Sequence, residues 1–270
     1  MSSRAYLLLT LGFYAVGALH ALLHALMRRR LFTNWSLTAA LAGFALHTAA
    51  LAQRWTEAGH FPAVGLHDGA SLLAWTIVLA SLTTYLRTKE DALGLAAYPA
   101  AFALVLVANL TPVSVNEDPI LRSLFLPIHT TMVFLGYGAL FVAFAMGLLY
   151  LIQERELKSR SPHTFYYLLP SLERCDTIGA RSVAVGFGFL TLAILTGVLW
   201  NHAVHGRYWS WDAKEGSAVI AWLIYVGLLV ARRRSGWGGR RAAFLGIAGF
   251  ATVAFTFVWV ALSGVAGAAR

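Results

Sequence analysis

The sequence holds a single cysteine, Cys175, and little charge. One cysteine excludes an internal disulfide and a Cys-x-x-Cys pair, so the chain is neither a dithiol oxidoreductase nor a c-type cytochrome with its own Cys-x-x-Cys-His attachment site. Charged residues make up 12% of the 270 residues, whereas hydrophobic residues make up 59%. Soluble domains are about a quarter charged, so this composition argues against a single globular core in water.

Acidic residues are the scarcer charged class, with 12 Asp and Glu against 21 Lys and Arg, which gives a net charge of +9. The basic residues stand in short clusters between apolar segments. This placement is typical of loops that set the topology of a membrane protein. We therefore expect the lipid bilayer, and no nucleic acid, to be the partner of these basic residues.

Long apolar segments are what the sequence has in place of charge. A transmembrane helix needs about 20 apolar residues to cross a hydrocarbon core of roughly 30 Å. The sequence thus predicts an all-α membrane protein, a polytopic bundle of about eight transmembrane helices that forms one domain over residues 1–270. The predicted helices are 5–27, 36–54, 68–87, 93–111, 129–152, 182–200, 217–232 and 242–263. The first is expected to be a helix and not a cleaved signal, because Arg28, Arg29 and Arg30 follow it instead of preceding it.

The distribution of basic residues among the short loops predicts the orientation. If the loop 28–35 lies in the cytoplasm, the connections on that side carry 15 Lys and Arg and those on the other side carry 6, which together make the 21 of the chain. Both termini are then expected to lie outside. The loop 201–216 and the stretch 111–128 are expected on the same outer side.

The clearest chemical signal lies between residues 200 and 215. Four large aromatic rings stand there within a dozen residues, those of Trp200, Tyr208, Trp209 and Trp211. Rings at helix ends also form ordinary aromatic belts, but belt residues rarely come so closely interleaved with charges. Flat rings can bury a porphyrin, Arg207 and Lys214 are placed to meet its propionates, and Asp212 can fix the loop by local hydrogen bonds.

The stretch 208–215, Tyr-Trp-Ser-Trp-Asp-Ala-Lys-Glu, resembles the signature Trp-Ser-Trp-Asp-Pro-Lys-Glu of the CcsA family of haem-handling proteins in cytochrome c maturation. Residues 220–225, 236–241, 190–198 and 59–62 also resemble that family, and the resemblance is densest from 129 to 262. It implies that 201–216 is an external haem-binding loop. The haem-binding residues it implies here are Trp200, Arg207, Tyr208, Trp209, Trp211, Asp212 and Lys214.

The resemblance also implies an axial ligand for the haem iron. His129, at the outer start of the fifth predicted helix, matches the position of one of the family's external axial histidines, and imidazole nitrogen ligates haem iron. The family usually carries a second external histidine after a Leu-Ser-Gly stretch, yet residues 265–270 contain none. Its intramembrane histidine near the end of the seventh helix is also absent around 230–232. The second axial ligand therefore stays open.

Other histidines are candidates for that second ligand or for a further site. The external candidates are His60, His67, His202 and His205, and Asp68 is expected to orient His67 by a hydrogen bond. The candidates inside apolar spans are His20, His24 and His47. Ionisable groups within a membrane indicate a site, so His47 is counted among the expected haem-binding residues. Helix–helix hydrogen bonding by a neutral imidazole is the alternative.

Two functions follow from the resemblance. The first is a haem-handling protein in the bacterial inner membrane that binds b-type haem transiently and presents it for attachment to apocytochrome c. It would act with a second membrane subunit, as part of a cytochrome c haem lyase complex. The alternative is an assembly or regulatory protein of the same scaffold that has lost haem transfer. The missing histidines favour the alternative, and the tryptophan signature favours the first.

Overall fold

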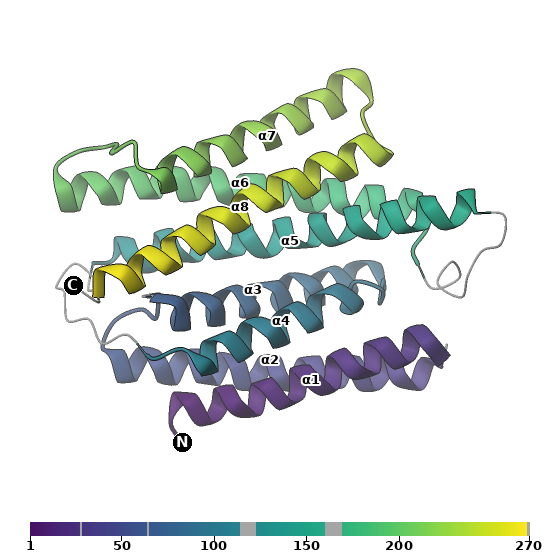
Figure 1. The fold of residues 1–270 in the computed structure, drawn as a ribbon, viewed down its shortest axis with the longest axis horizontal. Coiled ribbons are helices and arrows are strands. Elements are labelled where there is room, and N and C mark those ends of the chain that lie inside the picture. The colour runs from purple at the N-terminus through teal and green to yellow at the C-terminus, as the bar shows by residue number, and fades with distance from the viewer. Residues whose placement is uncertain (28, 64, 114–122, 160–168, 269–270) are drawn as a thin grey trace.

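The computed structural model describes residues 1–27, 29–63, 65–113, 123–159 and 169–268, with side chains up to 259 (Figure 1). These residues form eight α-helices and no strand. The helices are α1 (Ser3–Met27), α2 (Arg30–Ala58), α3 (Gly65–Thr88), α4 (Gly94–Leu110), α5 (Phe125–Lys158), α6 (Leu172–His205), α7 (Ala213–Ser235) and α8 (Gly239–Ala268). Each predicted span falls on one of these helices, so the all-α prediction is confirmed.

The helices have the lengths that a multi-pass membrane protein needs. Within the described chain, 7 helices are long and apolar enough to cross a membrane, and α4, with 17 residues, is shorter. The helices α5 and α6 have 34 residues each, which corresponds to about 50 Å. The predicted bounds 129–152 and 182–200 were too short, because they counted apolar positions only. Polar turns prolong both helices beyond the hydrocarbon core.

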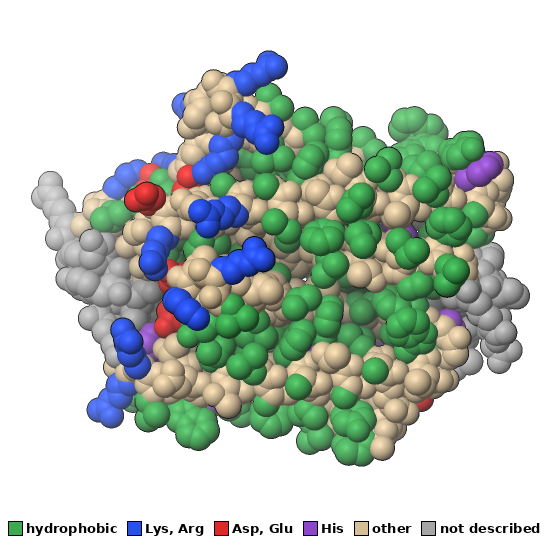
Figure 2. Space-filling model, turned by 180° about the vertical axis from the view of Figure 1, so that it is seen from behind, with side chains coloured by type: hydrophobic (Ala, Val, Ile, Leu, Met, Phe, Trp, Pro, Cys, Tyr) green, Lys and Arg blue, Asp and Glu red, His purple; other side chains and the backbone are tan. Residues whose placement is uncertain are grey.

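The connections divide between two ends of the bundle (Figure 1). The tryptophan end holds the start of α1, the start of α5 and the α6–α7 loop, residues 206–212. The basic end holds the α1–α2, α3–α4, α5–α6 and α7–α8 turns. Lys and Arg side chains gather toward the basic end (Figure 2). The bundle thus has the charge asymmetry that the positive-inside rule describes.

Small residues let the central helix α5 approach its neighbours closely. A Cβ added at Gly138 would lie 2.5 Å from the Thr76 carbonyl oxygen of α3. One added at Gly136 would lie 3.4 Å from the Leu190 backbone nitrogen of α6, and one at Gly147 would lie 3.1 Å from a carbonyl oxygen of α8. In lipid, such close backbone packing supplies much of the attraction between helices. Through α5 the helices α1–α4 are joined to α6–α8.

Candidate functional site

The α6–α7 loop is bounded by two helix ends with clear local causes. The helix α6 ends at His205 because Gly206 adopts a left-handed conformation, with φ of 70°. The helix α7 begins after Asp212, whose Oδ1 accepts a hydrogen bond from the Glu215 backbone N–H at 2.8 Å. An aspartate at this capping position satisfies one of the backbone donors that a helix start leaves unpaired. Asp212, expected to fix the loop, makes this local bond.

The Glu215 carboxylate fixes the loop by accepting hydrogen bonds from its backbone. Its Oε2 accepts hydrogen bonds from the backbone N–H groups of Ser210, at 2.7 Å, and Trp211, at 2.8 Å. Asn201, near the end of α6, donates from Nδ2 to the Ser210 hydroxyl at 3.1 Å and toward Glu215 Oε1 at 3.4 Å. The sequence analysis assigned no role in the site to Glu215. The spacing Asp-x-x-Glu, which is that of a capping box, was the available signal.

This bonding presents aromatic rings at the surface. Trp211 has a φ of 55°, a left-handed conformation that a residue with a bulky side chain rarely adopts. Its side chain is 82% exposed and meets Trp209 edge to face, with 5.7 Å between ring centroids. Tyr208 stacks on His202 at 4.0 Å. Backbone strain of this kind costs about 1–3 kcal/mol and tends to occur where a ligand is held.

His129 lies beside the end of α6, near the root of the loop. Its Nδ1 donates to the Ala193 carbonyl oxygen at 2.9 Å, which leaves the lone pair of the neutral ring on Nε2. Its ring lies 5.7 Å from that of Trp200, the residue before Asn201. A Cβ at Gly197 would come within 2.9 Å of His129 Cε1, so the missing side chain makes room for the imidazole. A histidine oriented through Nδ1 in this way is the usual arrangement for ligating a metal through Nε2.

Two indole N–H groups of the site have no hydrogen-bond acceptor among the described residues. Nε1 of Trp200 and Nε1 of Trp209 are buried and have no hydrogen-bond partner among the residues that the structure describes. Buried polar groups without a partner are rare in folded proteins. Arg207 is exposed in the same loop. These donors and this cation match a ligand that combines a flat apolar body with carboxylates, as a porphyrin does.

Other predicted site residues lie elsewhere or outside the description. The side chain of Lys214 lies outside the described part of the chain. His47 is fully buried among α1, α2 and α3, where Nδ1 faces the Tyr14 hydroxyl at 3.2 Å and Nε2 faces the Ser71 hydroxyl at 3.0 Å. Both ring nitrogens are thus engaged, as in the alternative of helix–helix hydrogen bonding. An iron ligand at His47 would require one of these bonds to break.

The remaining candidate histidines also make hydrogen bonds; those of His60 and His67 use Nδ1 and a backbone carbonyl, as in His129, so they do not exclude ligation through Nε2. His67 Nδ1 donates to the Ala108 carbonyl oxygen at 2.6 Å. The expected His67–Asp68 bond is not formed, because Asp68 turns instead to Arg54. His20 Nδ1 bonds to the Val16 carbonyl oxygen, and His24 faces Asp91. His60 Nδ1 bonds to the Phe61 carbonyl oxygen and His205 Nδ1 to Asn201. Among the described residues no group of three or more His, Cys, Asp or Glu side chains is arranged to hold a metal ion.

The fold and the site together define a class of membrane protein. The chain is an eight-helix membrane protein, within its described residues, that displays an aromatic loop beside an oriented imidazole. The family described as "Cytochrome C assembly protein" matches residues 6–265. The chain therefore belongs to the cytochrome c assembly protein family, and it has a role in cytochrome c maturation.

Individual relatives agree with this assignment. The chain is 32% identical over 246 residues to the "Cytochrome c biogenesis protein CcsA" of Synechococcus sp. (strain CC9902), a match that covers 82% of this chain and 81% of the relative. It is 32% identical over 260 residues to the protein of the same name from Prochlorococcus marinus (strain MIT 9303), covering 85% and 81%.

A solved structure shares the fold. The "Cytochrome c Heme Lyase CcmF" superposes with a TM-score of 0.67 at 16% identity, over 98% of this chain. The superposition covers 51% of the CcmF chain, so this chain spans about half of that protein's length.

Proposed function

We propose that this protein binds haem at the tryptophan end of the bundle and presents it for attachment to apocytochrome c. In this proposal Trp209 and Trp211 cover the porphyrin, His129 Nε2 ligates the iron, and the indole N–H groups and Arg207 meet the propionates. The observation that carries the proposal is the His129 ring, oriented through Nδ1 and packed on Trp200 at 5.7 Å. Haem is the cargo, and it supplies the vinyl groups on which thioether bonds form.

The charge asymmetry supports a proposal for the orientation of the site in the cell. We propose that the basic end faces the cytoplasm of a bacterium and that the tryptophan end, with both termini, faces outward from the inner membrane. This orientation puts the loop on the side where secreted apocytochromes arrive. A second membrane subunit is the proposed source of the second axial ligand.

The proposal predicts a haem spectrum that depends on His129. Protein purified in detergent from haem-replete cells is expected to show a Soret band, which weakens and shifts in His129→Ala because the iron loses a nitrogen ligand. His24→Ala is the matched control, since it removes an imidazole at the basic end, where His24 faces Asp91. A colourless wild-type preparation, or a spectrum identical in His129→Ala, would falsify the proposal.

Gly197→Ala is expected to displace His129 without touching the aromatic loop. The added Cβ would lie 2.9 Å from His129 Cε1 and the ring must move away from α6. We expect haem affinity to fall by about tenfold, equivalent to 1.4 kcal/mol, with little loss of thermal stability. Gly188→Ala on the same helix is the control, because nothing lies within 4 Å of its Cβ. If Gly197→Ala and Gly188→Ala bind haem with equal affinity in titrations, Gly197 has no role in positioning His129.

A further inference from the structure

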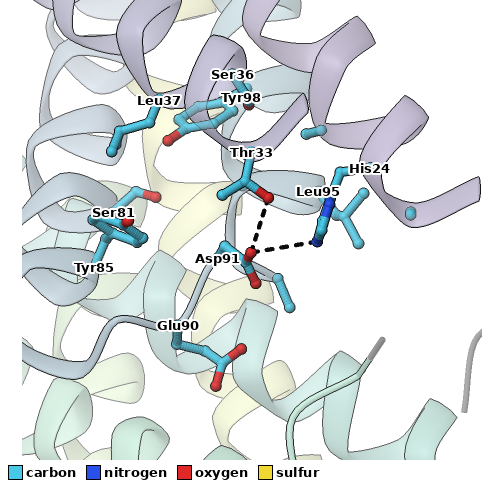
Figure 3. Close-up of a pocket in the computed structure, with 14 residues that line it drawn as sticks. His24, Thr33, Ser36, Leu37, Ser81, Tyr85, Glu90, Asp91, Leu95 and Tyr98 are labelled. Carbon is cyan, nitrogen blue, oxygen red and sulfur yellow. Dashed lines mark hydrogen bonds and ion pairs between the residues drawn. The ribbon is translucent and has the colours of Figure 1, made fainter. Parts of the chain in front are cut away.

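A cavity lies at the basic end of the bundle, beside the α3–α4 turn. It is partly open and is lined by α1, α2, α3, α4 and that turn, with about 510 Å³ of empty space that includes open solvent (Figure 3). Its polar lining comes from His24, Thr33, Ser36, Ser81, Tyr85, Glu90, Asp91 and Tyr98. No Lys or Arg is among the described residues that line it.

The charge inside this cavity is negative. Asp91 Oδ2 accepts from the Thr33 hydroxyl at 3.2 Å and lies 3.4 Å from His24 Nε2, as the dashed lines in Figure 3 show. Glu90 is matched from outside the cavity by Arg174, which donates to it at 3.1 Å. Burial raises the pKa of the Glu90 carboxyl, and the hydrogen bond from Arg174 offsets part of that rise. Asp91 Oδ2 already faces His24 and Thr33, so among the described contacts Oδ1 is the carboxylate oxygen that remains for a further cation.

Two buried hydroxyls in the lining lack partners. Ser81 is 2% exposed and Tyr98 is 6% exposed, and neither hydroxyl makes a hydrogen bond to any residue that the structure describes. Ser36, in contrast, donates to the Gly17 carbonyl oxygen at 2.8 Å. Neither oxygen is sealed off inside the protein, so water or a ligand in the cavity can satisfy both hydroxyls. Ser81 and Tyr98 thus offer hydrogen-bonding capacity to an occupant of the cavity.

The aromatic and apolar lining indicates the kind of cation. The rings of Tyr85 and Tyr98 can attract an ammonium group through their π-faces. Lys89 Nζ already lies 5.5 Å from the centroid of the Tyr85 ring, so an external ammonium would have to use the Tyr98 ring or the other face of Tyr85. Apolar side chains line the rest of the cavity and suit a short aliphatic stem; they belong to Ala21, Ala25, Leu37, Ala92 and Leu95. A carboxylate, hydroxyls and aromatic faces together recognise a primary ammonium.

The position of the cavity points to a lipid as the source of that ammonium. It lies where helices end at the basic end of the bundle, beside the exposed Arg29 and Arg30. The Arg29 carbonyl oxygen accepts from His24 Nδ1 at 3.1 Å, so the Arg29 backbone lies next to a residue that lines the cavity. A guanidinium there can pair with a phosphate. We propose that this cavity binds the headgroup of phosphatidylethanolamine, its ammonium at Asp91 and the Ser81 and Tyr98 hydroxyls, its phosphate at Arg29 and Arg30.

The test uses the whole protein in nanodiscs made with phosphatidylethanolamine or, as the comparison, phosphatidylcholine, whose trimethylated head cannot donate hydrogen bonds. Thermal unfolding and native mass spectrometry of retained lipid are the measurements. We expect a higher Tm and preferential retention with phosphatidylethanolamine, both lost in Asp91→Asn. Glu154→Gln, at the same end but not lining the cavity, is the matched control and is expected to keep both.

Further variants keep the outcome decisive if Asp91→Asn folds poorly. Ser81→Ala and Tyr98→Phe delete only the two unpartnered hydroxyls, and each is expected to reduce the lipid preference while leaving Tm in phosphatidylcholine unchanged. Equal Tm and retention in the two lipids would overturn the proposal. Stabilisation by added ethanolamine in phosphatidylcholine nanodiscs, without any lipid preference, would overturn the lipid source and assign the site to a soluble amine. None of these measurements depends on bound haem.

Discussion

Glu215→Ala is expected to abolish most haem binding although Glu215 need not touch the haem. The Glu215 carboxylate holds two successive backbone N–H groups, at 2.7 and 2.8 Å, and thereby keeps Trp211 in its left-handed, exposed conformation. Without it the strain at Trp211 is no longer opposed, and the loop relaxes into other conformations. We expect haem affinity to fall by about ten- to a hundredfold, equivalent to roughly 1.4–2.8 kcal/mol.

A graded series separates this role from a general loss of the fold. Glu215→Gln keeps one carbonyl oxygen that can accept from the loop, so its affinity should lie between those of wild type and Glu215→Ala. Glu57→Ala, at the same end, removes a carboxylate that bonds to Ser3 instead, and it should bind haem normally. The measurement is haem titration followed by absorption, with thermal unfolding alongside. Wild-type affinity in Glu215→Ala would show that the loop does not need this carboxylate.

Asp68→Asn is expected to be the most destabilising single substitution among the polar residues described above. Asp68 is 1% exposed and accepts from Arg54 Nε at 3.0 Å, and Arg54 is itself 8% exposed. The substitution leaves a buried guanidinium facing a neutral amide. Breaking a buried ion pair by removing one partner costs about 3–5 kcal/mol, because the remaining charge has lost both water and its counter-ion.

Glu154 provides the comparison, since its two partners, Lys158 and Arg240, have side chains that are 67% and 61% exposed. Glu154→Gln is expected to cost less than about 1 kcal/mol, as surface pairs do. Both variants can be compared by thermal unfolding in one detergent. A Tm for Asp68→Asn that equals the Tm of Glu154→Gln would mean that water or another group compensates Arg54 in the fold.

The helices and the aromatic loop could be predicted from the sequence because both depend on local residue patterns. A run of about 20 apolar residues is a sufficient signal for a span, and the spacing of Trp209, Trp211 and Asp212 is read directly. Contacts between helices across the bundle could not be predicted in this way. The bond from His129 to Ala193 joins residues 64 positions apart, and no periodicity reports which way an imidazole turns. Nor could the sequence show that the Tyr14 and Ser71 hydroxyls face the two ring nitrogens of His47.

The central claim is that His129 and the aromatic loop act on one bound haem, and a double-mutant cycle tests it most directly. Haem affinity would be measured for wild type, His129→Ala, Trp211→Ala and the double variant. If both residues hold the same haem, the losses are not additive, and we predict a coupling energy of about 1 kcal/mol or more. Strictly additive losses would contradict a shared site, as would unchanged affinity in both single variants.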